Sequence, residues 1–290
     1  MDHPFRLDFV GIGAARCGTS WITDCLRAHP QICLSSKKEI RYFNARHHLR
    51  NIPNRNHTKP LSWYASHFEH CLPGQVRGEF SPPYLWDGAA PPLIKRHFPD
   101  VKLLVSLRNP IDRAYSSHLR RIFHKVETCT FEQAVAKRTG PIKNGFYAQQ
   151  LSRYFDLFPP EQILVVFFDQ TTADPANWFK RVFAFLGVDP DVSIPEATML
   201  TKVNAAQSPH QDPKPKRMTL LQQMARHPRL LPIRAAYGKI APSRRSEENS
   251  DAPWQYPPMK PETREYLFNL YKDDIRRLEQ MLGCDLSHWR

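Results

Sequence analysis

Short apolar runs alternate with stretches of helical periodicity along most of this sequence. The runs at 5–12, 76–80, 101–107 and 162–168 have the length of strands, and 101–107 is apolar enough to be covered on both faces of a parallel sheet. Between them, helical spacing and helix-start signals predict helices at 19–28, 61–71, 90–98, from 110 onward, 145–158, 174–186 and 262–282. Because strands and helices alternate, we expect an α/β fold with a central parallel sheet.

The domain organisation follows from length and composition. The chain has 290 residues, 41% of them hydrophobic, and we expect a single domain over 1–290. The stretch 188–260 is basic, proline-rich and irregular, which predicts loops around a site. The remaining stretch, 261–290, carries the last predicted helix, which should pack back on the sheet. No apolar window of about 18 residues occurs, so we expect no transmembrane segment.

Cysteine and histidine usage bears on the compartment and on metal binding. The six cysteines form no C-x-x-C pair: they are Cys17, Cys25, Cys33, Cys71, Cys129 and Cys284. Together with the lack of secretory-signal features in residues 1–6, this pattern favours reduced thiols and a cytoplasmic protein. The nearby histidines His47, His48, His67 and His70 show no known ligand spacing, so we expect no metal site.

The charge balance limits the class of partner. A formal net charge of +13 indicates an acidic partner, such as a nucleotide or an acidic glycan. The basic residues are dispersed, and no long basic run is interleaved with aromatic residues. We therefore expect no nucleic acid as the main partner.

The most informative stretch is 10–21, where an apolar strand runs through a glycine-framed turn into a helix. Gly13 and Gly18 have the spacing of a phosphate-binding loop, in which free backbone N–H groups at the helix start face an anion. An ATP-binding loop would have lysine after the second glycine, but that position is Thr19, and the cation of the loop is Arg16. Such a loop suits one or two phosphates and not a magnesium-bound triphosphate.

A second strand-to-helix junction begins at Arg108, directly after the strand 101–107. Asn109 can cap the following helix, and Pro110 suits its first position. Ser116 lies two helical turns on, so a guanidinium and a hydroxyl can converge on one phosphate. Since ligands of parallel sheets bind beyond the carboxyl ends of the strands, we expect both junctions to form one site.

Two phosphate sites without a magnesium-binding carboxylate pair suit 3′-phosphoadenosine 5′-phosphosulfate (PAPS), and the sequence resembles the sulfotransferase family. Residues 13–21 resemble its 5′-phosphosulfate loop, and 108–116 resemble its 3′-phosphate motif. Residues 38–44 are similar to the Lys-Glu-x-His-Phe-Phe-Asp segment of the heparan-sulfate and bacterial branch, and 78–84 resemble that branch's Glu-Lys-Thr-Pro-x-Tyr turn. The resemblance runs from about residue 8 to 289.

The resemblance implies a three-layer fold like that of the P-loop nucleotide hydrolases. It also implies in-line transfer of a sulfuryl group from PAPS, without a metal, to a hydroxyl or amine of a carbohydrate, glycolipid or small metabolite. The released product would be adenosine 3′,5′-bisphosphate. Glu39 matches the general base, and Arg16 would stabilise the departing phosphate.

Further site residues are carried over from the same motifs. The expected donor-binding residues are Ala15, Arg16, Cys17, Gly18, Thr19, Ser20, Trp21, Arg108, Ser116 and Tyr147, with Lys216 and Arg217 as candidates that close over the 3′-phosphate. The expected acceptor-binding residues are Lys38, Arg41, Glu79 and Phe80. For Trp21 and Tyr147, packing in the core is an equally good interpretation.

The sequence departs from the family pattern at Arg16 and Phe80, where relatives have lysine, at Arg41 for histidine and at Asn44 for aspartate. Two other functions therefore stay open. One is a kinase that uses Mg-ATP, against which the missing loop lysine argues. The other is a non-catalytic nucleotide-binding protein on the same fold. No pattern selects a particular acceptor or an oligomeric state.

Overall fold

The computed structural model describes residues 5–46, 52–124, 126–172, 174–200 and 258–289. In this part of the chain, five parallel strands form a sheet in the spatial order β2-β3-β1-β4-β5. The strands are β1 (Phe9–Gly13), β2 (Ile32–Leu34), β3 (Val76–Phe80), β4 (Lys102–Leu107) and β5 (Ile163–Phe167). This order confirms the predicted parallel α/β sheet and places the carboxyl ends of β1 and β4 side by side.

The helices follow the strands in sequence. They are α1 (Thr19–Arg27), α2 (Leu61–Ala65), α3 (Ala90–His97), α4 (Pro110–Phe123), α5 (Phe131–Ala136), α6 (Gly140–Lys143), α7 (Tyr147–Phe155), α8 (Pro175–Leu186), α9 (Glu196–Leu200) and α12 (Pro261–Leu282). Short 3-10 turns are η1 (Arg55–Thr58), η2 (Ser66–Phe68), η3 (Pro82–Tyr84), η4 (Pro160–Gln162) and η5 (Phe168–Thr172). Of the helices described, none is long and apolar enough to cross a membrane.

One predicted helix needs correction, and the short helices α5, α6 and α9 and the strand β2 were not predicted. The helix expected at 61–71 is shorter in the structure: α2 ends at Ala65, and the 3-10 turn η2 follows it directly. After η2 the chain bends toward β2. The sequence reading missed α5, which has only six residues and is stabilised at its start by a reciprocal pair of hydrogen bonds between Thr130 and Gln133. Such short helices depend on capping more than on an apolar stripe.

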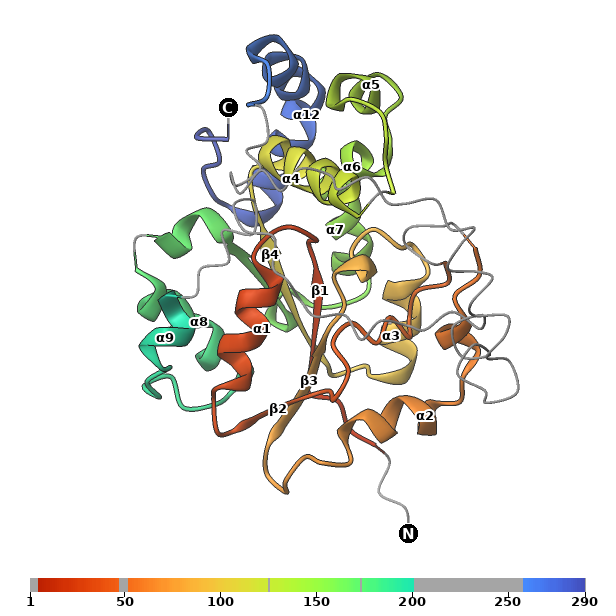
Figure 1. Ribbon diagram of the computed structural model, residues 1–290. Helices are drawn as coiled ribbons and strands as arrows, with labels where there is room; N and C mark the ends of the chain where they lie inside the picture. The colour runs from red at the N-terminus through yellow and green to blue at the C-terminus, as the bar shows by residue number, and fades with distance from the viewer. Residues whose placement is uncertain (1–4, 47–51, 125, 173, 201–257, 290) are drawn as a thin grey trace, which may run out of the picture. The chain divides into compact units, whose positions relative to one another are not determined.

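Both faces of the sheet are covered, as the apolar strand pattern predicts. Side chains alternate along the strands, so Phe9 and Leu104 pack into a cluster with α1 and α8, whereas Val10 and Leu103 pack into the larger cluster on the other face. The larger cluster includes residues of α3, α4, α7 and α12. Figure 1 shows α1 and α8 on one side of the strands and α3 on the other.

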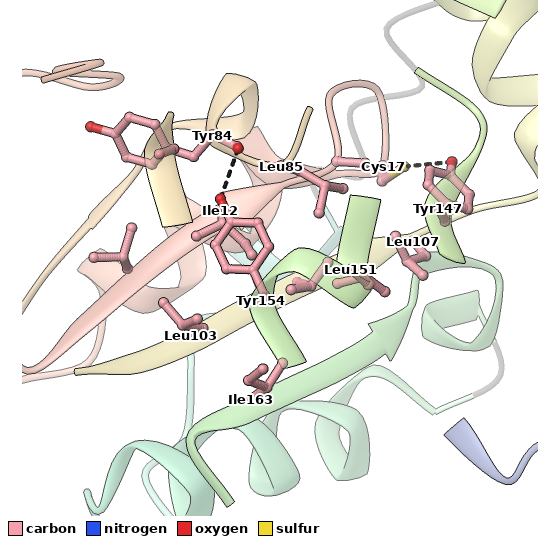
Figure 2. Close-up of a cluster of buried hydrophobic side chains, with 14 of the residues drawn as sticks. Ile12, Cys17, Tyr84, Leu85, Leu103, Leu107, Tyr147, Leu151, Tyr154 and Ile163 are labelled. Atoms are coloured by element: carbon pink, nitrogen blue, oxygen red, sulfur yellow. Dashed lines mark hydrogen bonds between the residues drawn. The ribbon is translucent and has the colours of Figure 1, made fainter. Parts of the chain in front are cut away.

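The larger cluster contains tyrosines whose hydroxyls bind backbone oxygens. Tyr154, on α7, donates a hydrogen bond of 2.7 Å to the carbonyl oxygen of Tyr84 in η3 (Figure 2). Leu103 and Leu151 pack beside this bond and are fully excluded from solvent. The contact satisfies the polar end of a buried tyrosine and fixes α7 against the turn that follows β3.

The C-terminal helix packs back on the fold, as predicted. Leu267 and Leu278 on α12 are fully buried in the larger cluster. Asp274 accepts hydrogen bonds from the backbone N–H groups of Ala148 (2.9 Å) and Gln149 (3.1 Å) in the first turn of α7. A carboxylate at that place stabilises the helix start. The described residues before 201 and after 257 belong to one compact unit.

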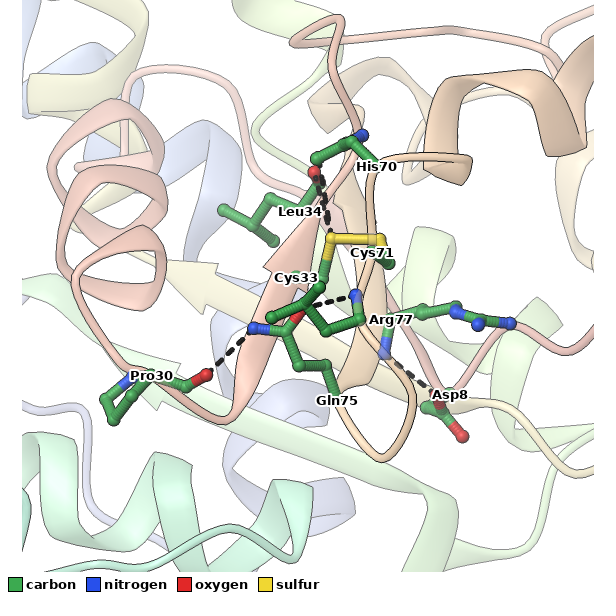
Figure 3. Close-up of a disulfide and its surroundings, with 9 residues drawn as sticks. Asp8, Pro30, Cys33, Leu34, His70, Cys71, Gln75 and Arg77 are labelled. Carbon is green, nitrogen blue, oxygen red and sulfur yellow. Dashed lines mark hydrogen bonds between the residues drawn. A yellow bond between two sulfur atoms is a disulfide. The ribbon is translucent and has the colours of Figure 1, made fainter.

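The prediction of six reduced thiols is wrong for one pair. Cys33 on β2 and Cys71 after η2 form a disulfide, with Cα atoms 5.6 Å apart (Figure 3). The other four cysteines, Cys17, Cys25, Cys129 and Cys284, are free. The two bonded residues are 38 positions apart, and only the course of the chain after η2 brings them together, so spacing could not indicate the bond.

Candidate active site

The first predicted phosphate-binding loop lies between the end of β1 and the start of α1. The residues expected to bind the donor here lie in this loop (Ala15, Arg16, Cys17 and Gly18) and in the first turn of α1 (Thr19, Ser20 and Trp21). Gly18 has a φ of +73°, and a Cβ there would lie 2.2 Å from the ring of Phe168. With glycine as its N-cap, α1 has no side-chain cap and no acidic residue in its first turn. Its first N–H groups are therefore suited to an anion.

The two predicted junctions meet. The Arg16 side chain reaches from the first loop to α4, where its Nε donates a hydrogen bond of 3.0 Å to Ser116 Oγ. Ser106 on β4 supports the loop from below, because its Oγ donates to the carbonyl oxygen of Cys17 (2.7 Å) and its carbonyl accepts from Ala14 N (2.7 Å). A cation and a hydroxyl from residues 100 positions apart thus face one another.

Arg108 lies at the carboxyl end of β4, where the guanidinium carbon is 5.9 Å from the centroid of the Phe168 ring. Its neighbour Asn109 caps α4 by accepting from Ile111 N at 2.9 Å, as the sequence predicts. Asn109 N in turn donates to Asp169 Oδ2 (3.2 Å), which also accepts from Trp289 Nε1 (3.0 Å). The C-terminal segment therefore helps to hold the second junction in place.

Three of the residues expected to bind the donor, Cys17, Trp21 and Tyr147, have side chains buried among other protein groups. Tyr147 is buried, and its hydroxyl donates to the carbonyl oxygen of Arg108 (3.0 Å) and lies 3.8 Å from Cys17 Sγ, so it joins the two junctions. Burial raises the pKa of the Cys17 thiol to about 11. Trp21 is 2% exposed and packs on Trp178 and Phe168. Its indole anchors α1, so a contact to the donor would have to come from its backbone.

The segment after β2 brings the expected base to the same edge. Glu39 accepts a hydrogen bond of 3.0 Å from Arg41 Nε and a second, shorter one from Arg41 Nη2. Both residues have a φ of +56°, a left-handed conformation that non-glycine residues adopt at a free-energy cost. Lys38 Nζ donates to Ser20 Oγ at 2.6 Å, which ties this segment to the first turn of α1.

A buried carboxylate supports the Glu39–Arg41 turn. Glu79 on β3 is fully buried and accepts hydrogen bonds from the hydroxyls of Tyr84 (2.6 Å), Ser81 (2.7 Å) and Tyr64 (3.1 Å). Ser81 Oγ also accepts from the backbone N–H of Arg41 at 3.0 Å. Burial raises the pKa of Glu79, although the three hydroxyl donors oppose the increase.

Direct acceptor contact by Glu79 and Phe80 does not fit this geometry. Both side chains are buried, since Glu79 is 0% and Phe80 is 2% exposed, so an acceptor cannot contact them. Successive strand residues point to opposite faces, so Phe80 packs into the cluster of α1 and α8. Sequence reasoning missed the hydroxyls of Tyr64, Ser81 and Tyr84. Ser81 and Tyr84 belong to the turn after β3, but Tyr64 lies on α2, and no local signal links it to Glu79.

Some predictions concern residues outside the described part of the chain, namely Lys216, Arg217, His47 and His48. Among the described residues, one cluster of three histidine or cysteine groups has its ligand atoms within 4.8 Å of one another: Cys33, His70 and Cys71. Its two sulfur atoms are joined in the disulfide, with His70 Nε2 3.4 Å from Cys33 Sγ.

A family model described as the sulfotransferase domain matches residues 7–223. Human heparan sulfate glucosamine 3-O-sulfotransferase 3B1 is 31% identical over 186 residues, which cover 61% of this chain and 45% of the human protein. Mouse heparan sulfate glucosamine 3-O-sulfotransferase 5 is 25% identical over 194 residues, which cover 63% of this chain and 54% of the mouse protein. The chain thus spans about half the length of the curated relatives it matches.

Among solved structures, a sulfotransferase from Alicyclobacillus acidocaldarius is similar over 98% of this chain and 99% of its own, with a TM-score of 0.69 and 26% identity. Because the family model matches well over half of the residues, this chain belongs to the sulfotransferase domain family.

Proposed function

We propose that this chain transfers a sulfuryl group from PAPS to a hydroxyl or amine of a carbohydrate, glycolipid or small metabolite by in-line displacement. The observation that carries the proposal is the hydrogen bond between Arg16 Nε and Ser116 Oγ, which joins two strand-to-helix junctions at one sheet edge. A donor with phosphates at both ends of its ribose needs two adjacent anion sites. Lys38 reaches the first of these sites through its hydrogen bond to Ser20, and Glu39 is the next residue along the chain.

The residues of the two junctions fit the donor. The uncapped start of α1 supplies N–H groups for the 5′ end, and Arg108 with Ser116 supplies a guanidinium and a hydroxyl for the 3′-phosphate. Arg16 would stabilise negative charge on the departing 5′-phosphate, a task for an always-protonated group. When bound, the donor supplies the sulfuryl group and a leaving phosphate.

Glu39 acts as the general base. As the acceptor oxygen or nitrogen bonds to sulfur and the bond between sulfur and the phosphate oxygen breaks, Glu39 takes the acceptor proton. Arg41 holds the carboxylate in one orientation through its two hydrogen bonds. The curated relatives are named for heparan sulfate glucosamine, so the first acceptors to test are sulfated glycans that contain glucosamine. An anionic acceptor is also attracted by Lys38 and Arg41.

The test begins with the wild-type chain and a donor labelled in its sulfuryl group. Label should move from PAPS to one of a panel of glycans, glycolipids and hydroxylated metabolites. Glu39→Gln should lower turnover by roughly a hundredfold or more and leave the affinity for adenosine 3′,5′-bisphosphate unchanged. The matched control is Glu161→Gln, which changes an exposed glutamate of η4 far from the site. Wild-type turnover in Glu39→Gln would remove the base assignment.

A thermal-shift titration separates the alternatives. Adenosine 3′,5′-bisphosphate should raise the melting temperature, because it binds only the folded chain, and Arg108→Ala or Ser116→Ala should reduce that shift. Stabilisation by Mg-ATP alone would establish a kinase instead. Binding of the bisphosphate without turnover on any acceptor would favour a non-catalytic binding protein.

A further inference from the structure

Lys38 places an ammonium group at the mouth of the first anion site. It belongs to the segment after β2, yet its Nζ donates a hydrogen bond of 2.6 Å to Ser20 Oγ, the hydroxyl of the second residue of α1. Both residues are exposed, so a ligand can reach the pair. The side chain therefore points toward the helix start whose N–H groups have no side-chain cap, and not only toward the acceptor side.

The loop itself lacks a cation at this place. The residue after Gly18 is Thr19, where ATP-binding loops have the lysine that reaches the phosphates. The loop's own cation, Arg16, is directed the other way, to Ser116 on α4. The 5′ end of a donor would therefore meet hydroxyls and N–H groups from α1, with an ammonium available from Lys38.

We propose that Lys38 supplies, from outside the loop, the ammonium group that contacts the 5′-phosphate end of the donor and stabilises negative charge there during transfer. This rests on the proposed sulfuryl transfer and changes the role expected for Lys38 from acceptor binding to donor binding and catalysis. Lys38 and Glu39 are neighbours in sequence, so one short segment brings both the leaving-group cation and the base to the reacting atoms. Arg16, bound to Ser116 on α4, then shares with Lys38 the negative charge on the departing 5′-phosphate.

The groups around Lys38 change its pKa, so the pH dependence of ligand affinity can report on its contribution. Surrounding protein atoms lower the pKa of its ammonium even though the residue is exposed, and Arg27 of α1 and Arg120 of α4 act in the same direction. Glu39 on its own segment and Asp24 of α1 oppose the decrease. Lys38 should thus lose its charge at a lower pH than the ordinary value of 10.5, whereas an arginine at this position would stay charged.

The experiment measures affinities by calorimetry for adenosine 3′,5′-bisphosphate and for adenosine 3′-monophosphate, which lacks the 5′-phosphate. Lys38→Gln should weaken binding of the bisphosphate about tenfold and leave that of the monophosphate unchanged, since the lost contact is one charged hydrogen bond to the 5′-phosphate. Arg108→Ala should weaken both ligands. The matched control is Lys37→Gln, which changes the exposed neighbouring lysine and should alter neither affinity.

Two further readouts separate a ligand contact from a local structural role. Lys38→Arg should keep most of the bisphosphate affinity and hold it at alkaline pH, where the wild-type affinity falls. Release of labelled sulfate from PAPS with water as acceptor should drop in Lys38→Gln and recover in part in Lys38→Arg. Bisphosphate affinity and sulfate release within twofold of wild type in Lys38→Gln would overturn the inference while the proposed function stands. No bisphosphate binding by the wild-type chain would overturn the proposed function itself.

Discussion

Opening the Cys33–Cys71 disulfide should lower the free energy of unfolding by about 4 kcal/mol. The crosslink joins residues 38 positions apart, and chain entropy assigns about this value to a loop of that length. For a domain of this size, the loss corresponds to a fall in melting temperature on the order of 10 °C. Other contacts hold the same corner, since Gln75 Nε2 donates to the carbonyl oxygen of Pro30 at 2.8 Å (Figure 3), so the opened chain should still fold at room temperature.

The assay starts from a count of thiols. Six cysteines are present and four are free, so the denatured chain should react at four thiols without reductant and at six after reduction. Thermal unfolding is then followed with and without reductant. The double variant Cys33→Ala, Cys71→Ala should melt at the lower temperature, and reductant should not change that temperature. The control Cys129→Ser, at a free and partly exposed thiol, should keep the wild-type response.

Two results would refute this reasoning at different points. Six reactive thiols in the untreated chain would show that the disulfide does not form. A fully reduced chain that melts within about 2 °C of the oxidised one would show that loop entropy does not stabilise this corner. The donor site should be unaffected either way, because the segment toward Glu39 is tied to β3 through Ser35 N and the carbonyl oxygen of Gly78 (3.0 Å).

Three other substitutions, one of them with a matched control, test separate parts of the structure. Glu79→Gln should remove a pH slope in urea unfolding: the raised pKa gives a contribution that is full below pH 4.5 and is lost as pH rises through the folded-state pKa. Gly18→Ala should destabilise by about 2 kcal/mol or more and weaken bisphosphate binding, because of its φ of +73° and the Phe168 ring. The control is Gly74→Ala: Gly74 has a φ of +83° and no atom near an added Cβ, so its loss of stability in the same melts reports the backbone strain alone. Asp274→Ala should lower the free energy of unfolding by about 1–2 kcal/mol, because the first turn of α7 loses its carboxylate cap, and the melting temperature should fall accordingly.

The fold was largely predictable because its signals are local. The apolar run that forms β4 fits a strand covered on both faces, and Asn109 with Pro110 marks the start of α4 within two residues. The meeting of the two junctions also followed, since adjacent parallel strands bring both to one edge, but the hydrogen bond between Arg16 and Ser116 was not predicted. Each step needed only a periodicity of two or 3.6 and the rule that ligands lie beyond the strand ends.

The acceptor side was less predictable because it depends on distant contacts. A motif treats Glu79 and Phe80 as neighbours with one role, yet alternation along β3 directs their side chains to opposite faces of the sheet, and both are buried. The partners of Glu79 come from α2, η3 and the residue before η3, and nothing in their spacing shows that three hydroxyls share one carboxylate. The disulfide is hidden for the same reason.

The two halves of the site are therefore built on different foundations. The proposed donor half consists of strand-to-helix junctions, where backbone N–H groups and the packing of Gly18 on Phe168 leave little freedom for change. The proposed acceptor half is a turn with Glu39 and Arg41 in left-handed conformations, held in place by Ser81 and the buried Glu79. A substitution in that support can move the base and its guanidinium partner together without touching the nucleotide loops. Changes of acceptor preference should accordingly arise beneath the turn, with donor binding preserved, and Lys38 is the point where the halves meet.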